Sequence, residues 1–346
     1  MPELTVNTQT PYIVTVERGV LARAGGILRG VSKCAKAAVI SDRNVHMLYG
    51  AALIASLESA GIEVFEFTFP AGESAKTLET VSRIYAFLAE HEFTRTDAVA
   101  ALGGGVAGDI AGFASATYLR GMDFFQVPTS LLAMVDSSVG GKTGVDITAG
   151  KNLVGSFHQP LAVAIDPDTL STLPEQELRS GMGEIIKYAA IMSSKLGEML
   201  ESDGGIDYEA VITESLSVKK SVVELDTFDT GIRQVLNFGH TLGHAIELHS
   251  GFEVAHGMAV GMGMAMITEF SEALGYTQPG TAAQLKALLM RFGLPTSYSV
   301  PLKELFKIAK NDKKRKGAMI TLALLERMGK YRLESFALSQ LTGETP

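Results

Sequence analysis

The sequence predicts two domains: an α/β amino-terminal domain of Rossmann-like type with a mainly parallel sheet, and a mainly α-helical carboxy-terminal domain. Two observations lead to this prediction. In the first half, short apolar runs alternate with segments of helical periodicity, which is typical of a parallel sheet covered by helices. After about residue 170 the segments are longer and keep helical apolar spacing, and β-prone runs return only near the end. We therefore expect domains at residues 1–170 and 171–346.

The first half supplies strands and helices in alternation. A run typical of a buried strand occurs at 37–42, and further strand-like runs occur at 63–69, 97–105, 124–129 and 162–166. Helical periodicity falls between the first four of these strands, at about 45–60, 76–90 and 106–119. Ligands of such folds bind beyond the carboxyl ends of the parallel strands, so the residues that follow these strands are the first candidates for a binding site.

The second half is expected to consist mainly of helices. Apolar spacing places five of them at about 174–193, 207–226, 231–249, 255–275 and 279–292. Thr172 and Pro174 are start signals for the first, because proline is favoured at the beginning of helices. Two β-prone runs follow at 318–325 and 331–336.

Composition is that of a globular enzyme. The 346 residues are 46% hydrophobic and 20% charged, and the formal charge of −8 argues against a general nucleic-acid binder. The single cysteine, Cys34, excludes an intramolecular disulfide and fits a reducing compartment. The amino terminus has no secretory pattern, and no apolar stretch is long enough for a membrane span. We expect a cytoplasmic enzyme with no nucleic-acid and no membrane partner.

A glycine-rich turn, GGGVAGD at 103–109, lies between a predicted strand and a predicted helix. Gly103, Gly105 and Gly108 satisfy G-x-G-x-x-G, a pattern that lets backbone N–H groups approach a pyrophosphate at a helix N-terminus. The pattern alone is equally consistent with a tight turn that packs a helix closely on a strand. Asp42 ends an earlier strand, where it could contact a ribose hydroxyl.

The run DSSVGGKTG at 136–144 contains GGKT but is not an ATP-binding P-loop. Asp136 stands where the first glycine of G-x-x-x-x-G-K-[ST] is required, so the phosphate cradle is incomplete. Lys142 can still pair with an anion as a point charge, and Lys151 and Asn152 are close enough in sequence to join it. Other basic groups are by themselves typical of a solvated surface, namely Lys219, Lys220, Arg233 and the run 310–317.

Glu184 and Lys187, in GEIIKY, are three residues apart and share a helix face. A solvated ion pair is one interpretation. The apolar neighbours Ile185 and Ile186 favour a semi-buried setting instead, and a buried carboxylate requires a partner or a metal.

Histidines are concentrated in one stretch of the second half. The chain has seven, and four of them are His240, His244, His249 and His256. No HExxH motif is present, but imidazoles with a carboxylate are the usual ligands of catalytic zinc, so a metal is favoured over a purely structural role. In LNFGHTLGHAIE, helical spacing alone makes His240 and His244 the easiest pair of ligands, because they are one turn apart.

Together these segments resemble the 3-dehydroquinate synthase family of sugar-phosphate cyclases. The resemblance is carried by GGGVAGDIAGFASATYLRG, VPTSLLAMVDSSVGGKTGVD, GKNLVGSFHQP, GMGEIIKY and GIRQVLNFGHTLGHAIE, in the family's order from about Ser41 to Lys314. It implies a dehydroquinate synthase-like fold and a homodimeric lyase of the shikimate pathway, which serves aromatic amino acid biosynthesis. The cofactors implied are NAD and one divalent metal, with zinc usual and cobalt possible.

The resemblance also implies the reaction, in which 3-deoxy-D-arabino-heptulosonate 7-phosphate gives 3-dehydroquinate and phosphate. NAD would oxidise the substrate transiently, phosphate would leave by β-elimination, and the same nicotinamide would return the hydride. Ring opening and an aldol closure would complete the carbocycle. NAD would therefore be recycled, and the metal would act as a Lewis acid on a substrate oxygen.

Site residues are implied position by position. The implied metal ligands are Glu184, His240 and His256. The implied NAD-contacting positions are Asp42, Asn44, Glu73, Lys76, Gly104, Gly105, Asp109, Thr129, Ser130, Lys151, Thr172 and Leu173. The implied substrate-binding positions are Arg120, Lys142, Asn152, Lys219, Arg233, Asn237, His244, Lys313 and Lys314.

Some of these positions have implied roles of their own. Lys219 and Arg233 would bind the substrate carboxylate, and Arg120 would reach the active site of the neighbouring subunit of the homodimer. Either Lys313 or Lys314 would join the groups around the phosphate. The implied catalytic residues are Lys142, His244, Lys187, Asp136 and Asn237.

Three positions depart from the family pattern: Met258, Met47 and Asp146, where the family often has Glu, His and Asn. None is an implied metal ligand. Two other enzyme types have the same general plan, namely a sugar-phosphate cyclase that makes a valiolone or 2-deoxy-scyllo-inosose, and a polyol or glycerol-phosphate dehydrogenase. The Lys219 and Arg233 pair favours a substrate with a carboxylate over those of the other cyclases. A dehydrogenase would consume NAD stoichiometrically and would not need the residues for phosphate elimination.

Overall fold

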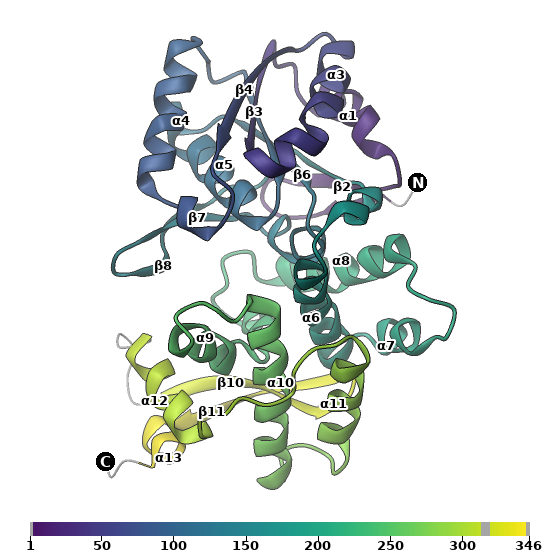
Figure 1. The fold of residues 1–346 in the computed structure, drawn as a ribbon, viewed down its shortest axis with the longest axis vertical. Helices are drawn as coiled ribbons and strands as arrows, with labels where there is room; N and C mark the ends of the chain where they lie inside the picture. The colour runs from purple at the N-terminus through teal and green to yellow at the C-terminus, as the bar shows by residue number, and fades with distance from the viewer. Residues whose placement is uncertain (1–2, 313–318, 344–346) are drawn as a thin grey trace. The chain divides into compact units, whose positions relative to one another are not determined.

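A seven-stranded sheet forms the centre of the first of two structural units (Figure 1). The computed structural model describes residues 3–312 and 319–343. The first unit holds the residues up to Leu173 together with Tyr208–Lys220, and the second holds Pro174–Asp207 together with the residues from Ser221 onward. The predicted fold class is confirmed, since the amino-terminal part contains a mostly parallel sheet and helices dominate the rest.

The strands of the large sheet lie in the order β1-β2-β9-β6-β5-β3-β4, and only the edge pair β1 and β2 is antiparallel. Their bounds are Glu3–Val6 (β1), Tyr12–Val16 (β2), Lys36–Asp42 (β3), Glu63–Phe69 (β4), Ala98–Gly103 (β5), Asp123–Pro128 (β6) and Ala162–Ile165 (β9). Successive strands β3 and β4 lie on one side of β5, and β6 lies on the other. The sheet therefore reverses its direction of growth beside β3 and β5, where α/β folds bind ligands.

Helices cover both faces of this sheet, which explains why β5 is buried along its whole length. They are α1 (Ala24–Val31), α3 (Ala51–Ser59), α4 (Leu78–Glu90) and α5 (Gly105–Thr117), with a short α2 (Arg43–Val45) after β3. Side chains of a strand alternate between faces. Accordingly Ile40 and Val99 pack with α4 and α5, whereas Val39 and Ala100 pack with α1 and α3.

A two-stranded hairpin, β7 (Lys142–Ile147) with β8 (Gly150–Phe157), also belongs to the first unit. The sequence did not predict it, because its glycine-rich strands lack a clear alternating pattern. It is tied to the segment before α4, since the N–H of Asp146 donates to the carbonyl oxygen of Lys76 at 2.8 Å.

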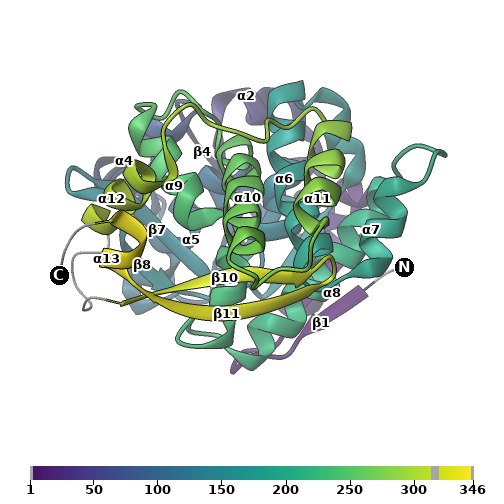
Figure 2. The ribbon, with the colours of Figure 1, turned by 90° about the horizontal axis from the view of Figure 1, so that it is seen from below.

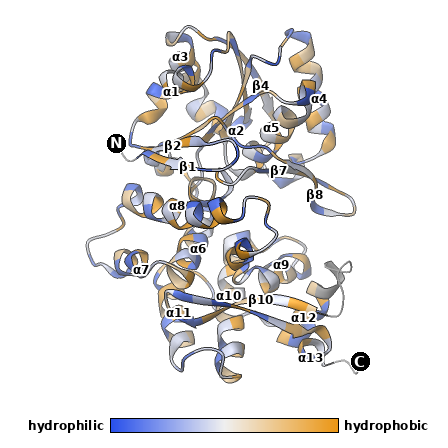
Figure 3. Cartoon of the chain, turned by 180° about the vertical axis from the view of Figure 1, so that it is seen from behind, coloured by the Kyte–Doolittle hydropathy of each residue, from blue (hydrophilic) through white to orange (hydrophobic). Residues whose placement is uncertain are grey.

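In the second unit, α10 (His256–Ala273) packs against α6 (Glu175–Ile191), α9 (His240–His249) and α11 (Thr281–Arg291). The remaining helices are α7 (Ser194–Glu201), α8 (Tyr208–Leu225, whose residues 208–220 belong to the first unit), α12 (Leu302–Asp312) and α13 (Leu338–Thr342). The hairpin β10 (Met319–Arg327) and β11 (Lys330–Ala337) packs against α10 and crosses it (Figure 2). Figure 3 shows apolar and polar residues on the same helices, as expected for helices that bury one face.

The prediction of one continuous helix over 231–249 is wrong. A 3₁₀ segment covers Ile232–Asn237, and α9 begins only at His240, after Gly239 in a left-handed conformation with φ 79°. A Cβ on Gly239 would lie 2.8 Å from the carbonyl oxygen of Val260, so the break allows close packing on α10. Within residues 3–312 and 319–343, no helix has the length and apolar composition that a bilayer crossing needs.

Candidate active-site residues

Three side chains that can ligate a metal converge in the second unit. Glu184 lies in α6, while His240 and His256 are the first residues of α9 and α10. Their ligand atoms all lie within 4.8 Å of one another. Oε1 of Glu184 is 3.4 Å from Nε2 of His240 and 3.6 Å from Nε2 of His256. One carboxylate and two imidazoles match the ligand sets of catalytic zinc, which keep a further position open, so this group could hold a metal.

The outer nitrogen of each imidazole has an oxygen partner. Nδ1 of His240 is 3.2 Å from the carbonyl oxygen of Phe238, and Nδ1 of His256 is 3.2 Å from Oε2 of Glu247. These acceptors favour a proton on Nδ1 and leave Nε2 directed to Glu184, as in many metal sites. Lys187 donates to the other carboxylate oxygen of Glu184 and so fixes its orientation.

The electrostatics of Glu184 and His240 fit a divalent cation. Glu184 is 1% exposed, and its buried Oε1 has no hydrogen-bond partner among the described residues. Burial disfavours its charged form, but Lys187 and His240 outweigh burial and hold the pKa of this carboxyl well below its usual range. Burial lowers the pKa of His240, so this ring is neutral at neutral pH. An ionised oxygen without a partner beside a neutral imidazole is a fitting cation ligand.

His256 has the opposite balance. Burial lowers the pKa of its ring, but Glu184 and Glu247 outweigh burial and raise that pKa to about 10. A proton would therefore compete with a metal for Nε2 of this residue.

Glycines allow the three helices to bring these side chains together. A Cβ on Gly257 would lie 2.0 Å from the carbonyl oxygen of Ser180, and one on Gly183 would lie 2.7 Å from the carbonyl oxygen of Gly257. The N–H of Gly257 also donates to Oγ of Ser180 at 3.0 Å. The backbones of α6 and α10 are thus in direct contact beside Glu184 and His256, a distance that only glycine permits.

His240 and His244 do not belong to one ligand group, although helical spacing alone favours them as a pair. The second candidate metal group among the described residues consists of His244, Glu247 and His256. The ring of His244 is 5.5 Å from that of His240, measured between centroids, and its side chain is exposed.

In the first unit, candidate NAD-binding residues gather at the carboxyl ends of β3, β5 and β6. Oδ1 of Asp42 accepts hydrogen bonds from the N–H groups of Asn44 and Val45, at 2.9 and 3.1 Å. Its Oδ2 is 3.5 Å from where a Cβ on Gly103 would lie. The N–H of Thr129 donates to the carbonyl oxygen of Gly103 at 2.9 Å.

Side chains of neighbouring segments lie close to the Cα atoms of the glycine-rich turn. A Cβ on Gly104 would lie 3.2 Å from Oγ of Ser130, and one on Gly105 would lie 3.1 Å from Oγ of Ser137. Gly104 is the N-cap of α5, so its neighbours present the free N–H groups of a helix start. The predicted strand–turn–helix context of GGGVAGD is confirmed.

Lys76 is the centre of a polar cluster beside this turn. Its Nζ is 2.6 Å from Oδ2 of Asp109 and donates to Oδ1 of Asn152 at 2.6 Å. Burial lowers the pKa of Lys76, but Asp109 and Glu73 outweigh burial and raise it, so the side chain is a cation. Nζ of Lys151 lies 3.5 Å from Oε1 of Glu73.

The remaining candidates are distributed as follows. Lys219 donates to the carbonyl oxygen and to Oδ1 of Asp136, the latter at 2.8 Å. Arg233 is 4% exposed and donates to the carbonyl oxygen of Thr227 at 2.7 Å. Oγ1 of Thr172 is 2.6 Å from the hydroxyl of Tyr49, and Leu173 caps the preceding 3₁₀ turn.

Four more candidates have exposed side chains, namely Arg120, Lys142, Asn152 and Asn237. Arg120 has φ 69° and Asn152 has φ 55°, both in the left-handed region, where strain is often found at functional positions. Lys313 and Lys314 lie outside the described residues. Of the positions that depart from the family pattern, Met47 is 78% exposed, and Asp146 accepts from the N–H of Asn152 at 2.7 Å.

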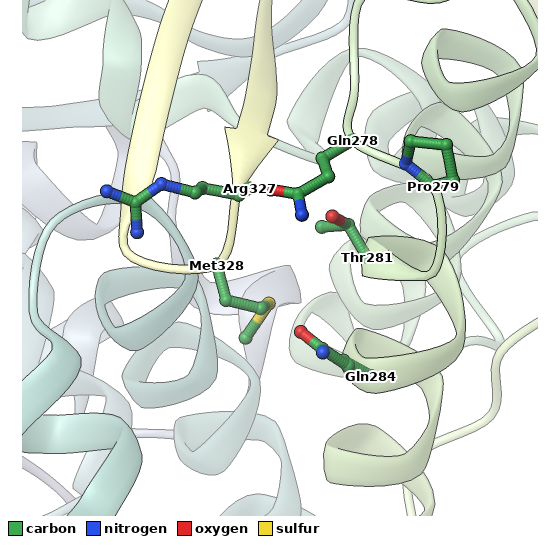
Figure 4. Close-up of a pocket in the computed structure, with 6 residues that line it drawn as sticks. All are labelled: Gln278, Pro279, Thr281, Gln284, Arg327 and Met328. Carbon is green, nitrogen blue, oxygen red and sulfur yellow. The ribbon is translucent and has the colours of Figure 1, made fainter.

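A hollow of about 230 Å³ lies elsewhere in the second unit, beside the turn between β10 and β11 (Figure 4). Its lining residues are Gln278, Pro279, Thr281, Gln284, Arg327 and Met328. The N–H groups at the start of α11 are already bonded to Glu272, at 2.9 Å for Gly280 and 2.8 Å for Ala282. Among the described residues, the one charged side chain that lines this hollow is Arg327, and no acid–base pair lines it, so it is a poor candidate for the catalytic centre.

Sequence reasoning missed Glu247, which contacts His256. The available signal was its spacing, since residues 240, 244 and 247 share one face of a helix. Its burial, at 7% exposed, could not be read from the sequence.

Comparison with known proteins identifies the family. Two family models match, "3-dehydroquinate synthase N-terminal" over residues 66–180 and "3-dehydroquinate synthase C-terminal" over residues 181–315. A 3-dehydroquinate synthase from Streptococcus suis is 44% identical over 98% of both chains. The chain belongs to the 3-dehydroquinate synthase family. An Enterococcus faecalis 3-dehydroquinate synthase, 43% identical over 98% of this chain and 97% of its own length, agrees.

Membership of this family confirms the predicted activity: the protein is a phosphate-eliminating lyase of the shikimate pathway, in aromatic biosynthesis. Among solved structures, the 2-epi-5-epi-valiolone synthase of Streptomyces hygroscopicus, with NAD⁺ and Zn²⁺ bound, has a TM-score of 0.87 at 26% identity, covering 98% of this chain and 97% of its own. A 2-deoxy-scyllo-inosose synthase complexed with carbaglucose-6-phosphate, NAD⁺ and Co²⁺ has a TM-score of 0.86 at 24% identity, covering 99% and 98%. A glycerol dehydrogenase from Schizosaccharomyces pombe, at 15% identity with a TM-score of 0.67 over 95% and 86%, shares the fold alone.

Proposed function

We propose that this synthase uses one NAD and one divalent metal, and that Glu184, His240 and His256 hold the metal. The observation that carries the proposal is that Oε1 of Glu184 has no hydrogen-bond partner among the described residues, while Nε2 of both histidines lies within 3.6 Å of it. The donor set suits zinc, and cobalt takes the same ligands. When bound, such a metal supplies Lewis-acid polarisation of a substrate oxygen. Lys187 fixes the Glu184 carboxylate from behind and keeps it ionised.

NAD is proposed to bind at the carboxyl ends of β3, β5 and β6. Support comes from the free N–H groups at the start of α5 and from Asp42 at the end of the neighbouring strand. The proposed contacts are Asp42, Asn44, Glu73, Lys76, Gly104, Gly105, Asp109, Thr129, Ser130, Lys151, Thr172 and Leu173. The two NAD-bound sugar-phosphate cyclases of similar fold add weight to this cofactor.

The proposed substrate, 3-deoxy-D-arabino-heptulosonate 7-phosphate, carries a carboxylate and a phosphate. In a protein of net charge −8 it requires local cations. In the first unit these are Lys142 for the phosphate and Lys219 for the carboxylate, with Asn152 as a hydrogen-bond donor. In the second unit Arg233 is the proposed carboxylate ligand, and Asn237 a hydroxyl ligand.

His244 is the proposed proton carrier during loss of phosphate. It is exposed and lies one helical turn after His240, so it could contact a substrate group close to the proposed metal ligands. The leaving phosphate can itself accept part of this proton. Asp136 is the proposed partner that orients Lys219, to which it is hydrogen-bonded.

The active form is proposed to be a homodimer in which Arg120 reaches the neighbouring active site. Arg120 is exposed and its backbone is left-handed, and both features support a role in contact with a neighbouring subunit. The cytoplasm remains the predicted location, and its support is the single cysteine, which is buried as a thiol.

The test uses chelator-treated protein, the heptulosonate phosphate, zinc and a small amount of NAD. Phosphate release should exceed the amount of NAD many times without net NADH, and omission of zinc should stop it. Net NADH formation with glycerol would instead indicate a dehydrogenase. Faster phosphate release from a sugar phosphate without a carboxylate would refute the proposed substrate.

A further inference from the structure

Glu247 is a buried carboxylate that contacts one of the proposed metal ligands. It lies in the last turns of α9, is 7% exposed, and its Oε2 is 3.2 Å from Nδ1 of His256. The end of the helix is fixed around it, because the N–H of Phe252 and the hydroxyl of Ser250 donate to its carbonyl oxygen at 2.8 and 3.0 Å.

The two histidines of the proposed metal group are held differently. His240 contacts a main-chain oxygen, that of Phe238, and its side chain is 13% exposed. The side chain of His256 is 33% exposed. His256 is also the first residue of its helix, and the N-cap residue of that helix, Ala255, makes no side-chain hydrogen bond. The more exposed ring therefore depends on a side chain, Glu247, for its orientation.

An ionised carboxylate can only accept a hydrogen bond, so Glu247 selects the proton on Nδ1 of His256. Nε2 then faces Oε1 of Glu184, 3.6 Å away, and is the ring nitrogen that could ligate a metal once it has lost its proton. A carboxylate behind a ligating histidine also raises the basicity of the ligand.

We propose that Glu247 is a positioning residue that accepts from Nδ1 of His256 and directs Nε2 of that ring to the metal. This inference rests on the proposed assignment of Glu184, His240 and His256 as the ligands. Loss of such an outer partner weakens metal binding by about 10–100-fold.

A second arrangement of the same residues makes a different prediction. His244, Glu247 and His256 also lie within 4.8 Å of one another through one ligand atom each. If that group held the metal, Glu247 would be a ligand itself, and removal of His244 would weaken binding as much as removal of Glu247.

The experiment titrates chelator-treated protein with Co²⁺, recording the visible absorption of bound cobalt and the dissociation constant by chelator competition. Glu247→Gln removes the charge at nearly constant shape, and Glu247→Asp keeps the charge but shortens its reach. Glu269→Gln is the matched control, because Glu269 lies in α10 with a 51% exposed side chain paired with Lys286. Thermal unfolding of the metal-free proteins checks that each variant is folded.

We expect Glu247→Gln to bind one equivalent of cobalt about 10–100-fold more weakly, with shifted absorption bands. Glu247→Asp should fall between this variant and the unaltered protein, and Glu269→Gln should match the unaltered protein. Unchanged affinity and spectrum in Glu247→Gln would overturn the inference. If that variant does not fold, unchanged affinity and spectrum in Glu247→Asp would overturn it.

Equal losses of cobalt affinity in Glu247→Gln and His244→Ala would also overturn the inference, because they would indicate that Glu247 ligates the metal directly.

His240→Ala separates this inference from the ligand assignment on which it rests. Full cobalt affinity in His240→Ala would refute the ligand assignment itself. Loss of binding in His240→Ala with no change in Glu247→Gln would refute only the positioning role.

Discussion

Gly257→Ala should disrupt both the packing of the second unit and its proposed metal site. The new Cβ would lie 2.0 Å from the carbonyl oxygen of Ser180, which is backbone and cannot rotate away. The two helices must therefore separate by about 1 Å or more to restore an ordinary contact. Glu184 follows Ser180 by one helical turn and His256 precedes Gly257, so the separation changes the distance between these two proposed ligands.

The expected magnitudes follow from this geometry. Overpacking of this kind costs about 3 kcal/mol in the free energy of unfolding. Metal–ligand distances lie within about 0.2 Å of their preferred values, so a larger displacement should lower zinc affinity by at least about tenfold. Equilibrium denaturation in urea and zinc titration against a chromophoric chelator measure the two effects.

Gly197→Ala is the control for this variant. Gly197 lies inside α7, and a Cβ there would meet no atom within 4 Å. Alanine is the better helix former, so this change should raise the free energy of unfolding by roughly 0.5–1 kcal/mol and leave zinc binding unchanged. Equal stability and zinc affinity in the two variants would refute the reasoning about close helix packing.

Two further predictions concern other charged groups. Lys76→Met should lower the free energy of unfolding by about 3 kcal/mol and weaken NAD binding, because it leaves Asp109 without its partner at 2.6 Å. Urea denaturation measures the first effect, and fluorescence titration with NADH measures the second. The control Lys33→Met, at an exposed position, should change neither quantity. Burial raises the pKa of Asp226, but backbone N–H groups of Thr230, Arg233 and Gly231 outweigh burial and hold that pKa below its usual value. Its contribution to stability is therefore present above the pKa of the unfolded chain and is lost as the pH falls through the pKa of the folded protein. Asp226→Asn should flatten the acid side of a plot of unfolding free energy against pH, and an unchanged slope would contradict this.

The sequence predicted the elements whose pattern is local. The strands β3 and β4 and the long helix α10 were placed to within about two residues, because their apolar residues are adjacent in sequence or recur at the spacing of the element. The turn at Gly103 was also found, since its glycines, its strand and its helix are adjacent in sequence.

Features that depend on distant contacts left little local signal. The break at Gly239 was missed because helical spacing continues across it, and its cause is contact with Val260 and Met264 in another helix. Residues 208–220 group with the first unit through contacts that spacing does not reveal. Helical spacing also favoured His244 over His256 as a candidate metal ligand. The helices α6, α9 and α10 are distant in sequence, and only their convergence decides which side chains meet Glu184.

The most direct test is the metal content of His240→Ala and His244→Ala, measured by mass spectrometry after loading with zinc and dialysis. Both changes remove one imidazole from the same face of α9. The account predicts that His240→Ala retains little zinc, whereas His244→Ala retains one equivalent and releases phosphate more slowly. A zinc-free His244→Ala beside a zinc-loaded His240→Ala would contradict the assignment of Glu184, His240 and His256 as the ligands.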